Sequence, residues 1–87
     1  MSDIMAHIHS VFKKYLSSLG SEGTMGKLDW DSLQWSSFLI ELFENQDPKW
    51  RDKFFQMAFI ENDLAELTVS EVERILLEAR DAIHQRS

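Results

Sequence analysis

The chain contains no cysteine, and this absence excludes disulfide-stapled scaffolds, thiolate zinc sites and cysteine nucleophiles. It also lacks any apolar run long enough to span a membrane. The segment Met1–His7 lacks the basic start and the continuous apolar stretch of a signal peptide. The sequence therefore predicts a cytoplasmic protein with no membrane association.

Positive charge is scarce as well: 9 Lys and Arg stand against 15 Asp and Glu, for a formal net charge of −6. This balance argues against nucleic acid or an anionic membrane as a partner and favours a protein with a positive patch. The 87 residues predict a single domain, 1–87, with little room for an enclosed active site. We expect a monomer that is not an enzyme.

Strand-like alternation of apolar and polar residues is absent too, which predicts an all-α fold, a small bundle of three to four helices. Apolar residues three and four apart predict a first helix from Ile4 to Leu19, ended by Gly20. The segment Gly20–Gly26 holds all three glycines, so we expect a flexible loop there.

The following segments carry helix-start signals. Asp31 is a suitable N-cap for a second helix over residues 31–43. Asp47 followed by Pro48 predicts a third start, because proline at the first helical position gives up an N–H that has no partner there.

The C-terminal third of the chain begins with an irregular pattern. Residues 61–67 predict a polar turn or a short irregular helix. Thr68 and Glu71 then have the spacing of a capping box, in which each side chain accepts a hydrogen bond from the backbone of the other residue. We therefore expect a last helix that begins after Thr68 and continues to Ile83.

The tripeptide Asp31-Ser32-Leu33 places a serine hydroxyl at the expected start of the second helix. A helix start offers unpaired N–H groups and the positive end of the macrodipole, which stabilise an attached phosphate. Serine at this position is also common as a simple cap, and on the residues alone that explanation is favoured. Because Asp31 is the better-placed cap, Ser32 is free to project into solvent as an attachment point.

Two segments of the chain resemble the acyl carrier protein family. The stretch Leu28–Glu44 resembles the modification site and second helix of these proteins, in which a leucine precedes the serine by four residues and Asp-Ser-Leu opens the helix. The stretch Phe59–Val69 is similar to the family's acidic short third helix and to the Thr-Val that opens its last helix. In size, acidity and helix order the whole chain is acyl-carrier-protein-like.

The resemblance implies a free-standing carrier with 4′-phosphopantetheine attached covalently to Ser32, between Asp31 and Leu33. A phosphopantetheinyl transferase would attach the arm from coenzyme A. Its terminal thiol would hold an acyl, aminoacyl or peptidyl group as a thioester, which suits a protein without cysteine. Fatty-acid, polyketide or nonribosomal-peptide biosynthesis, and secondary metabolism in particular, is the implied setting.

Residues near Ser32 are candidates for contact with partner enzymes that transfer or modify the acyl or aminoacyl group. Glu41 and Glu44 on the second helix would steer such enzymes by charge complementarity. Trp30 and Trp35 flank the serine, and we expect Trp30 to lie on the recognition surface. Trp35 joins the apolar stripe of the helix.

The sequence leaves two other functions open. One is an acidic helical interaction module, such as an inhibitor, an immunity-type protein or an adaptor, in which an aromatic patch binds the target and Ser32 carries nothing. The aromatic residues of the third-helix region are Trp50, Phe54, Phe55 and Phe59, and they could line a cargo cleft, dock an enzyme or simply form core. The other, an enzyme acting alone, is disfavoured because no nucleophile, base and orienting group share a usable spacing.

No metal site is predicted. His7 and His9 are two residues apart, which directs them to different sides of a helix instead of the common face that a helical metal site needs. Pairs of glutamates on the helices are explained as solvated faces.

Overall fold

The computed structural model describes residues 3–20 and 22–84 of the chain. This part contains four α-helices and three short helical turns, joined by loops. Residues 1, 2 and 21, which belong to the predicted N-terminal segment and glycine-rich loop, lie outside it. The elements are α1 (Asp3–Leu16), η1 (Met25–Lys27), α2 (Ser32–Phe43), α3 (Pro48–Phe55), η2 (Gln56–Ile60), η3 (Leu64–Glu66) and α4 (Val69–His84). Within the described residues no strand forms, so the prediction of an all-α helical bundle is confirmed.

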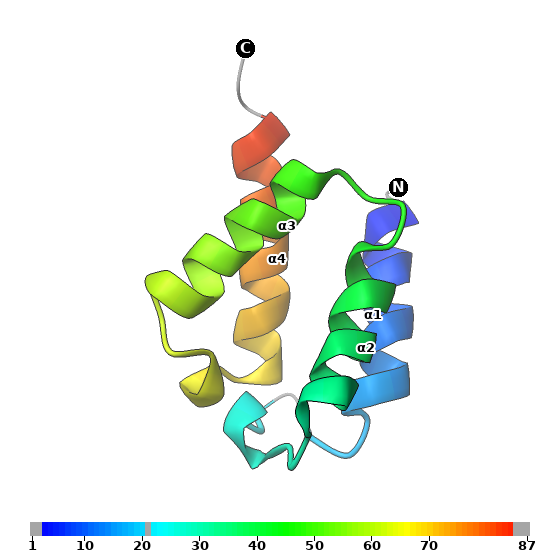
Figure 1. The fold of residues 1–87 in the computed structure, drawn as a ribbon, viewed down its shortest axis with the longest axis vertical. Helices are drawn as coiled ribbons and strands as arrows, with labels where there is room; N and C mark the ends of the chain where they lie inside the picture. The colour runs from blue at the N-terminus through cyan, green and yellow to red at the C-terminus, as the bar shows by residue number, and fades with distance from the viewer. Residues whose placement is uncertain (1–2, 21, 85–87) are drawn as a thin grey trace.

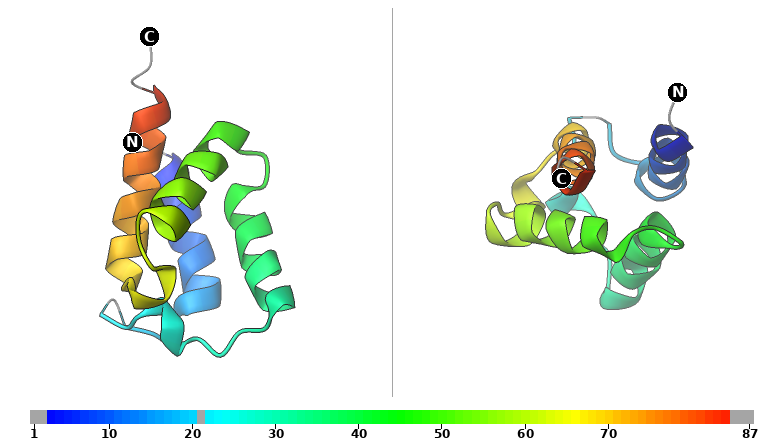
Figure 2. Two further views of the ribbon diagram at one scale, coloured as in Figure 1. Left: turned by 60° about the vertical axis from the view of Figure 1, so that its left-hand side comes forward. Right: turned by 90° about the horizontal axis from the view of Figure 1, so that it is seen from above.

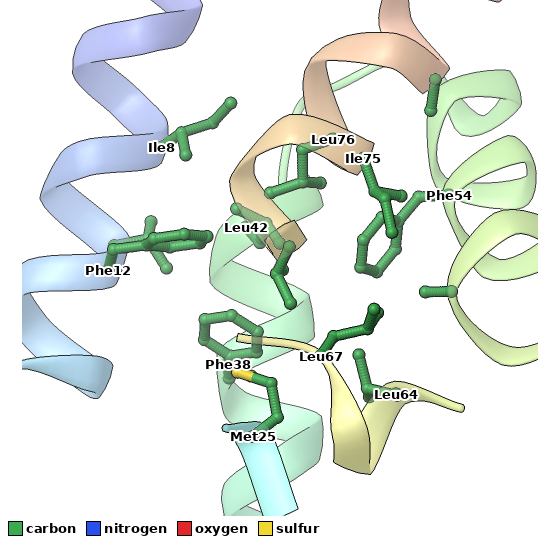
Figure 3. Packing of buried hydrophobic residues seen from close by; sticks show 14 of the residues in the cluster. Ile8, Phe12, Met25, Phe38, Leu42, Phe54, Leu64, Leu67, Ile75 and Leu76 are labelled. Atoms are coloured by element: carbon green, nitrogen blue, oxygen red, sulfur yellow. The ribbon is translucent and has the colours of Figure 1, made fainter. Parts of the chain in front are cut away.

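The helices are arranged as two neighbouring pairs, α1 beside α2 and α3 beside α4 (Figures 1 and 2). The turns η1 and η3 meet at the end of the bundle where α2 and α4 begin. All four helices and both of these turns contribute apolar side chains to one core (Figure 3). Burial of these faces supplies most of the driving force for folding, because apolar area is removed from water.

Helix α1 follows the predicted apolar stripe but ends earlier than expected, at Leu16 instead of Leu19. The Leu19 amide donates to the Leu16 carbonyl in a turn. Ser17 and Ser18 lie between them, and serine side chains compete for backbone hydrogen bonds and so shorten helices.

Helix α2 is fixed at both ends by local interactions. The Gln34 amide donates to Asp31 Oδ1 at 2.9 Å, and the Asp31 amide donates to Gln34 Oε1 at 3.3 Å, which completes a capping box. After Phe43 the chain turns at Asn45, whose φ of 61° lies in the left-handed region that asparagine tolerates. The prediction of a helix capped by Asp31 is confirmed.

Helix α3 starts as predicted, with Asp47 accepting from the Lys49 amide at 2.9 Å. It continues directly into the π-helical turn η2, where the Glu61 amide donates to the Gln56 carbonyl at 3.0 Å. The Asn62 side chain then donates to the Met57 carbonyl at 2.7 Å and satisfies an acceptor at the helix end. The third helical segment, α3 with η2, therefore extends from Pro48 to Ile60.

The glycine-rich segment is more structured than the sequence indicates. Thr24 forms an isolated antiparallel bridge with Thr68, and the Met25 amide donates to the Leu67 carbonyl at 2.8 Å. The Met25 side chain is buried in the core. The prediction of a flexible loop over residues 20–26 is wrong for its second half, because a buried side chain and a pair of backbone hydrogen bonds hold that half against the start of α4.

Three polar side chains link neighbouring helices. His7 donates from Nε2 to the Leu42 carbonyl at 2.9 Å, which joins α1 to the end of α2. His9 Nε2 lies 3.2 Å from Glu73 Oε2 on α4. The indole N–H of Trp50 donates to the Leu76 carbonyl at 2.8 Å and joins α3 to α4. The two histidines therefore contact different helices, as their spacing predicts, and α4 opens with the predicted Thr68–Glu71 capping box.

Candidate functional site

Ser32 is the first residue of α2 and is exposed to solvent. Because Asp31 caps the helix through the Gln34 amide, the Ser32 hydroxyl is not needed as a cap. The amide groups of Ser32 and Leu33 have no acceptor among the described residues. These N–H groups and the positive end of the macrodipole together favour a negatively charged substituent at this position.

The solvent-exposed face of α2 carries two apolar side chains. Leu33 is 72% exposed and Ile40 is 63% exposed, and their spacing of seven residues places them on one face. Glu44, the C-cap of the helix, is also exposed. Ile40 and Glu44 line a shallow groove of about 280 Å³ between α2 and α3. Two apolar side chains therefore lie on one face of α2, and the Glu44 carboxylate, which has no partner among the described residues, lies at the end of the helix opposite Ser32.

Trp30 and Trp35 are both half-buried and belong to an aromatic cluster that connects α1 with α2. The ring centroids of the two tryptophans are 4.8 Å apart in an edge-to-face arrangement. Trp30 also lies 6.0 Å from Tyr15 and 5.3 Å from Phe38. Trp30 therefore contributes to packing, and only part of its ring is available to a partner.

Glu41 lies between α1 and α2 and is engaged by two side chains of α1. Lys14 Nζ lies 2.9 Å from Glu41 Oε2, and the Tyr15 hydroxyl donates to the same oxygen. The Tyr15 hydrogen bond, followed by that of Lys14, holds the pKa of Glu41 below its usual value of 4.5. The same bonds raise the pKa of Lys14 and of Tyr15. Glu41 thus joins two helices, whereas the Glu44 side chain has no ion pair or hydrogen bond among the described residues.

We expect acid to weaken the α1–α2 contact through Glu41. Because its pKa is lower in the folded than in the unfolded protein, its contribution is complete above pH 4.5 and is lost as the pH falls through the folded pKa. A Glu41→Gln variant should therefore lose less stability than the native protein on acidification, measured by urea unfolding at a series of pH values. Glu44→Gln, on the same helix, should keep the native pH dependence, and identical profiles for Glu41→Gln and the native protein would contradict this role.

An open pocket of about 630 Å³ is lined by Trp35, which follows Ser32 by one helical turn on α2. This volume is in the range of small-molecule sites, about 300–1,000 Å³. Trp35 forms the wall on α2, and Phe59, which is 49% exposed, contributes from η2. The other lining residues are Met25, Gly26, Leu28, Asn62, Asp63, Leu64 and Ala65.

Most of these pocket residues could not be recognised from the sequence. Gly26 is required for the pocket because a Cβ atom there would lie 2.8 Å from the Ala65 carbonyl oxygen, so η1 and η3 meet at backbone distance. One signal was present: Met25 is a large apolar residue between Gly23 and Gly26, which indicates an anchor. The approach of η1 to η3 is a tertiary contact with no local signature.

The aromatic residues of the third helical segment have separate roles. Trp50 and Phe54 are buried in the core, with exposed fractions of 0% and 1%. Phe55 is half-buried against Phe54 and Phe43. Phe59 lines the pocket, and Ile60 beside it is 80% exposed. Of the four aromatic residues predicted to form a cleft, a docking patch or core, two are core and one lines a pocket.

The described structure thus defines a small all-helical protein with an exposed serine at a helix start and an open pocket whose wall includes Trp35, one turn further along the same helix. No helix among the described residues has the length and apolar character needed to cross a membrane, and these residues contain no cluster of three or more His, Cys, Asp or Glu suited to a metal ion. No protein-family model matches the chain, and neither a curated protein nor a solved structure matches it significantly.

Proposed function

We propose that this protein is a carrier that takes a 4′-phosphopantetheine arm on Ser32 and presents a thioester-linked acyl, aminoacyl or peptidyl group to partner enzymes. The observation that supports it most is that two different residues act at the start of α2: Asp31 caps the helix and Ser32 is exposed. Asp31 satisfies the Gln34 amide, so the Ser32 hydroxyl is exposed and uncommitted.

The residues around Ser32 fit an attached phosphodiester. In the attachment step the Ser32 hydroxyl oxygen forms the new bond to phosphorus, coenzyme A loses adenosine 3′,5′-bisphosphate, and the hydroxyl proton passes to a base of the transferase. The amide groups of Ser32 and Leu33 face the negative charge that results. The terminal thiol of the arm supplies the thioester chemistry, which this chain without cysteine cannot provide itself.

The surroundings of Ser32 also suit transient meetings with enzymes. Leu33 and Ile40 present apolar side chains on α2, and Glu44, which has no partner among the described residues, presents a carboxylate at the other end of the helix. A basic enzyme surface would be steered by this charge, and the small apolar contact would favour rapid release. The open pocket lined by Trp35 and Phe59 offers a place, reached from one turn further along α2, where a group carried on the arm can be partly covered.

Incubation with coenzyme A and a broad-specificity phosphopantetheinyl transferase tests this function. We expect the intact mass of the native protein to increase by one 4′-phosphopantetheinyl group, and peptide mapping to locate that group on Ser32. An unchanged mass with several different transferases would contradict the carrier function.

One observation favours a second function, that of an acidic helical interaction module. Phe59 and Ile60 are exposed apolar residues next to the carboxylates of Glu61 and Asp63. Such a surface suits a basic protein partner with an apolar anchor. In that case the protein would act with an unmodified Ser32, so the transferase experiment separates the two functions.

A further inference from the structure

The open pocket lined by Trp35 combines aromatic residues with a carboxylate. Of the nine residues that line it, all within the described part of the chain, Asp63 alone has a charged side chain. Two aromatic residues, Trp35 and Phe59, line the same space. A cavity built only to shield a hydrocarbon chain gains nothing from a carboxylate, whereas an aromatic and acidic cavity is suited to a cation.

Packing holds the two aromatic side chains in place. The Trp35 ring lies edge-to-face against Trp30 at 4.8 Å and against Phe38 at 6.2 Å. The Phe59 ring lies edge-to-face against Phe55 at 5.5 Å. Both residues also line the pocket, and because the face of an aromatic ring carries partial negative charge, it attracts a cation that enters.

The carboxylate of Asp63 is also oriented by the fold. Its Oδ1 accepts from the Ala65 amide at 3.2 Å at the start of η3, and Oδ2 has no partner among the described residues. The close approach of Gly26 to Ala65 fixes η3 against η1. One carboxylate oxygen therefore remains available to a bound group.

The local charge favours the same kind of ligand. Residues 54–73 include no Lys or Arg, and the basic residue adjacent in sequence to the pocket lining is Lys27, between Gly26 and Leu28. The carboxylates of this segment belong to Glu61, Asp63, Glu66, Glu71 and Glu73. An ammonium group next to this segment is stabilised by the surrounding negative potential, and a carboxylate-bearing group is repelled.

We propose that the pocket binds the ammonium group of an aminoacyl cargo, with the cation between the rings of Trp35 and Phe59 and the carboxylate of Asp63. This inference rests on the proposed function, because the cargo reaches the pocket only from an arm on Ser32. It narrows the cargo from any acyl group to those with an amine near the thioester.

A matched pair of cargoes tests the inference. The transferase loads ¹⁵N-labelled protein from two stable amide analogues of acyl-coenzyme A, one phenylalanyl and one 3-phenylpropanoyl, which differ only in the ammonium group. The Trp35 indole N–H signal reports occupancy, and the pKa of the loaded ammonium group is measured by NMR titration. We expect the phenylalanyl group to shift the Trp35 signal more than the 3-phenylpropanoyl group does.

Asp63→Asn removes the charge and keeps an oxygen for the Ala65 amide, and Glu66→Gln removes a charge from the same turn outside the pocket. In Asp63→Asn we expect the binding constant of the ammonium group for the pocket to fall about two- to fivefold, typical of the loss of an exposed ion pair, because the aromatic rings remain. The ammonium pKa should fall in Asp63→Asn and change less in Glu66→Gln.

The outcomes separate the two proposals. A protein that takes up neither analogue contradicts the carrier function itself, and the inference with it. Loading with equal Trp35 shifts for both cargoes, a larger shift for 3-phenylpropanoyl, or equal effects of Asp63→Asn and Glu66→Gln would overturn the inference and leave the carrier function standing.

Discussion

Replacing Ser32 with alanine is expected to abolish phosphopantetheine attachment while leaving the free energy of unfolding within about 0.5 kcal/mol of the native value. The modification is lost because the accepting oxygen is gone. Stability is retained because Ser32 is exposed and because Asp31, not Ser32, accepts from the Gln34 amide. Intact mass after treatment with transferase and coenzyme A measures the first effect, and urea unfolding measures the second.

Two variants on the same helix serve as controls for Ser32→Ala. Ser36→Ala changes another exposed serine of α2 and should be modified as fully as the native protein. Asp31→Ala removes the cap and should cost about 1 kcal/mol of stability while keeping the hydroxyl that accepts the arm. If Ser32→Ala were destabilised as much as Asp31→Ala, the serine would be the cap and the assignment of roles would be wrong.

The largest loss of stability is expected for Trp50→Ala. Trp50 is fully buried between α3 and α4, its indole donates to the Leu76 carbonyl at 2.8 Å, and Arg80 lies over its ring at 5.8 Å. Truncation of such a side chain costs about 3–5 kcal/mol. A domain of this length has a total stability of about 4–13 kcal/mol. We therefore expect a large fall in the urea midpoint, or loss of the folded state.

If Trp50→Ala does not fold, the stability of Trp50→Phe can be measured in its place. It retains most of the buried volume and loses the hydrogen bond, for an expected cost of about 1 kcal/mol for the bond and somewhat more for the smaller ring. Phe59→Ala, at a half-exposed position, should cost clearly less than Trp50→Ala. A cost below 1 kcal/mol for Trp50→Ala would contradict the packing of α3 on α4.

The helix starts were predictable because their causes are local. Asp31 with Gln34, Asp47 with Pro48, and Thr68 with Glu71 are pairs a few residues apart, and their hydrogen bonds form in the structure as the spacing indicates. The buried stripe of α1 was also predictable from its period, although its last turn was not. Two serines ended that helix before the glycine that was expected to do so.

Whether each tryptophan is buried or exposed could not be predicted from the sequence in the same way. Trp30 and Trp50 have no local feature that distinguishes a surface tryptophan from a core one. Trp50 is buried because α3 packs on α4, and Trp30 is half-buried because α1 brings Tyr15 against it. Glu41 is a similar case: its charge was visible in the sequence, but its pairing with Lys14 depends on the register of α1 against α2.

The sequence by itself determined the helical class and the helix starts, because these depend on periodicity and on side chains within one turn, whereas the structure shows that Asp31 and not Ser32 accepts from the Gln34 amide. The tertiary structure decided where the apolar and acidic groups meet. Met25 and Gly26 reach η3 only because Met25 is buried in the common core and Gly26 allows backbone contact with Ala65. That long-range contact creates the pocket lined by Trp35, since chain segments far apart in sequence meet only when the apolar core brings them together.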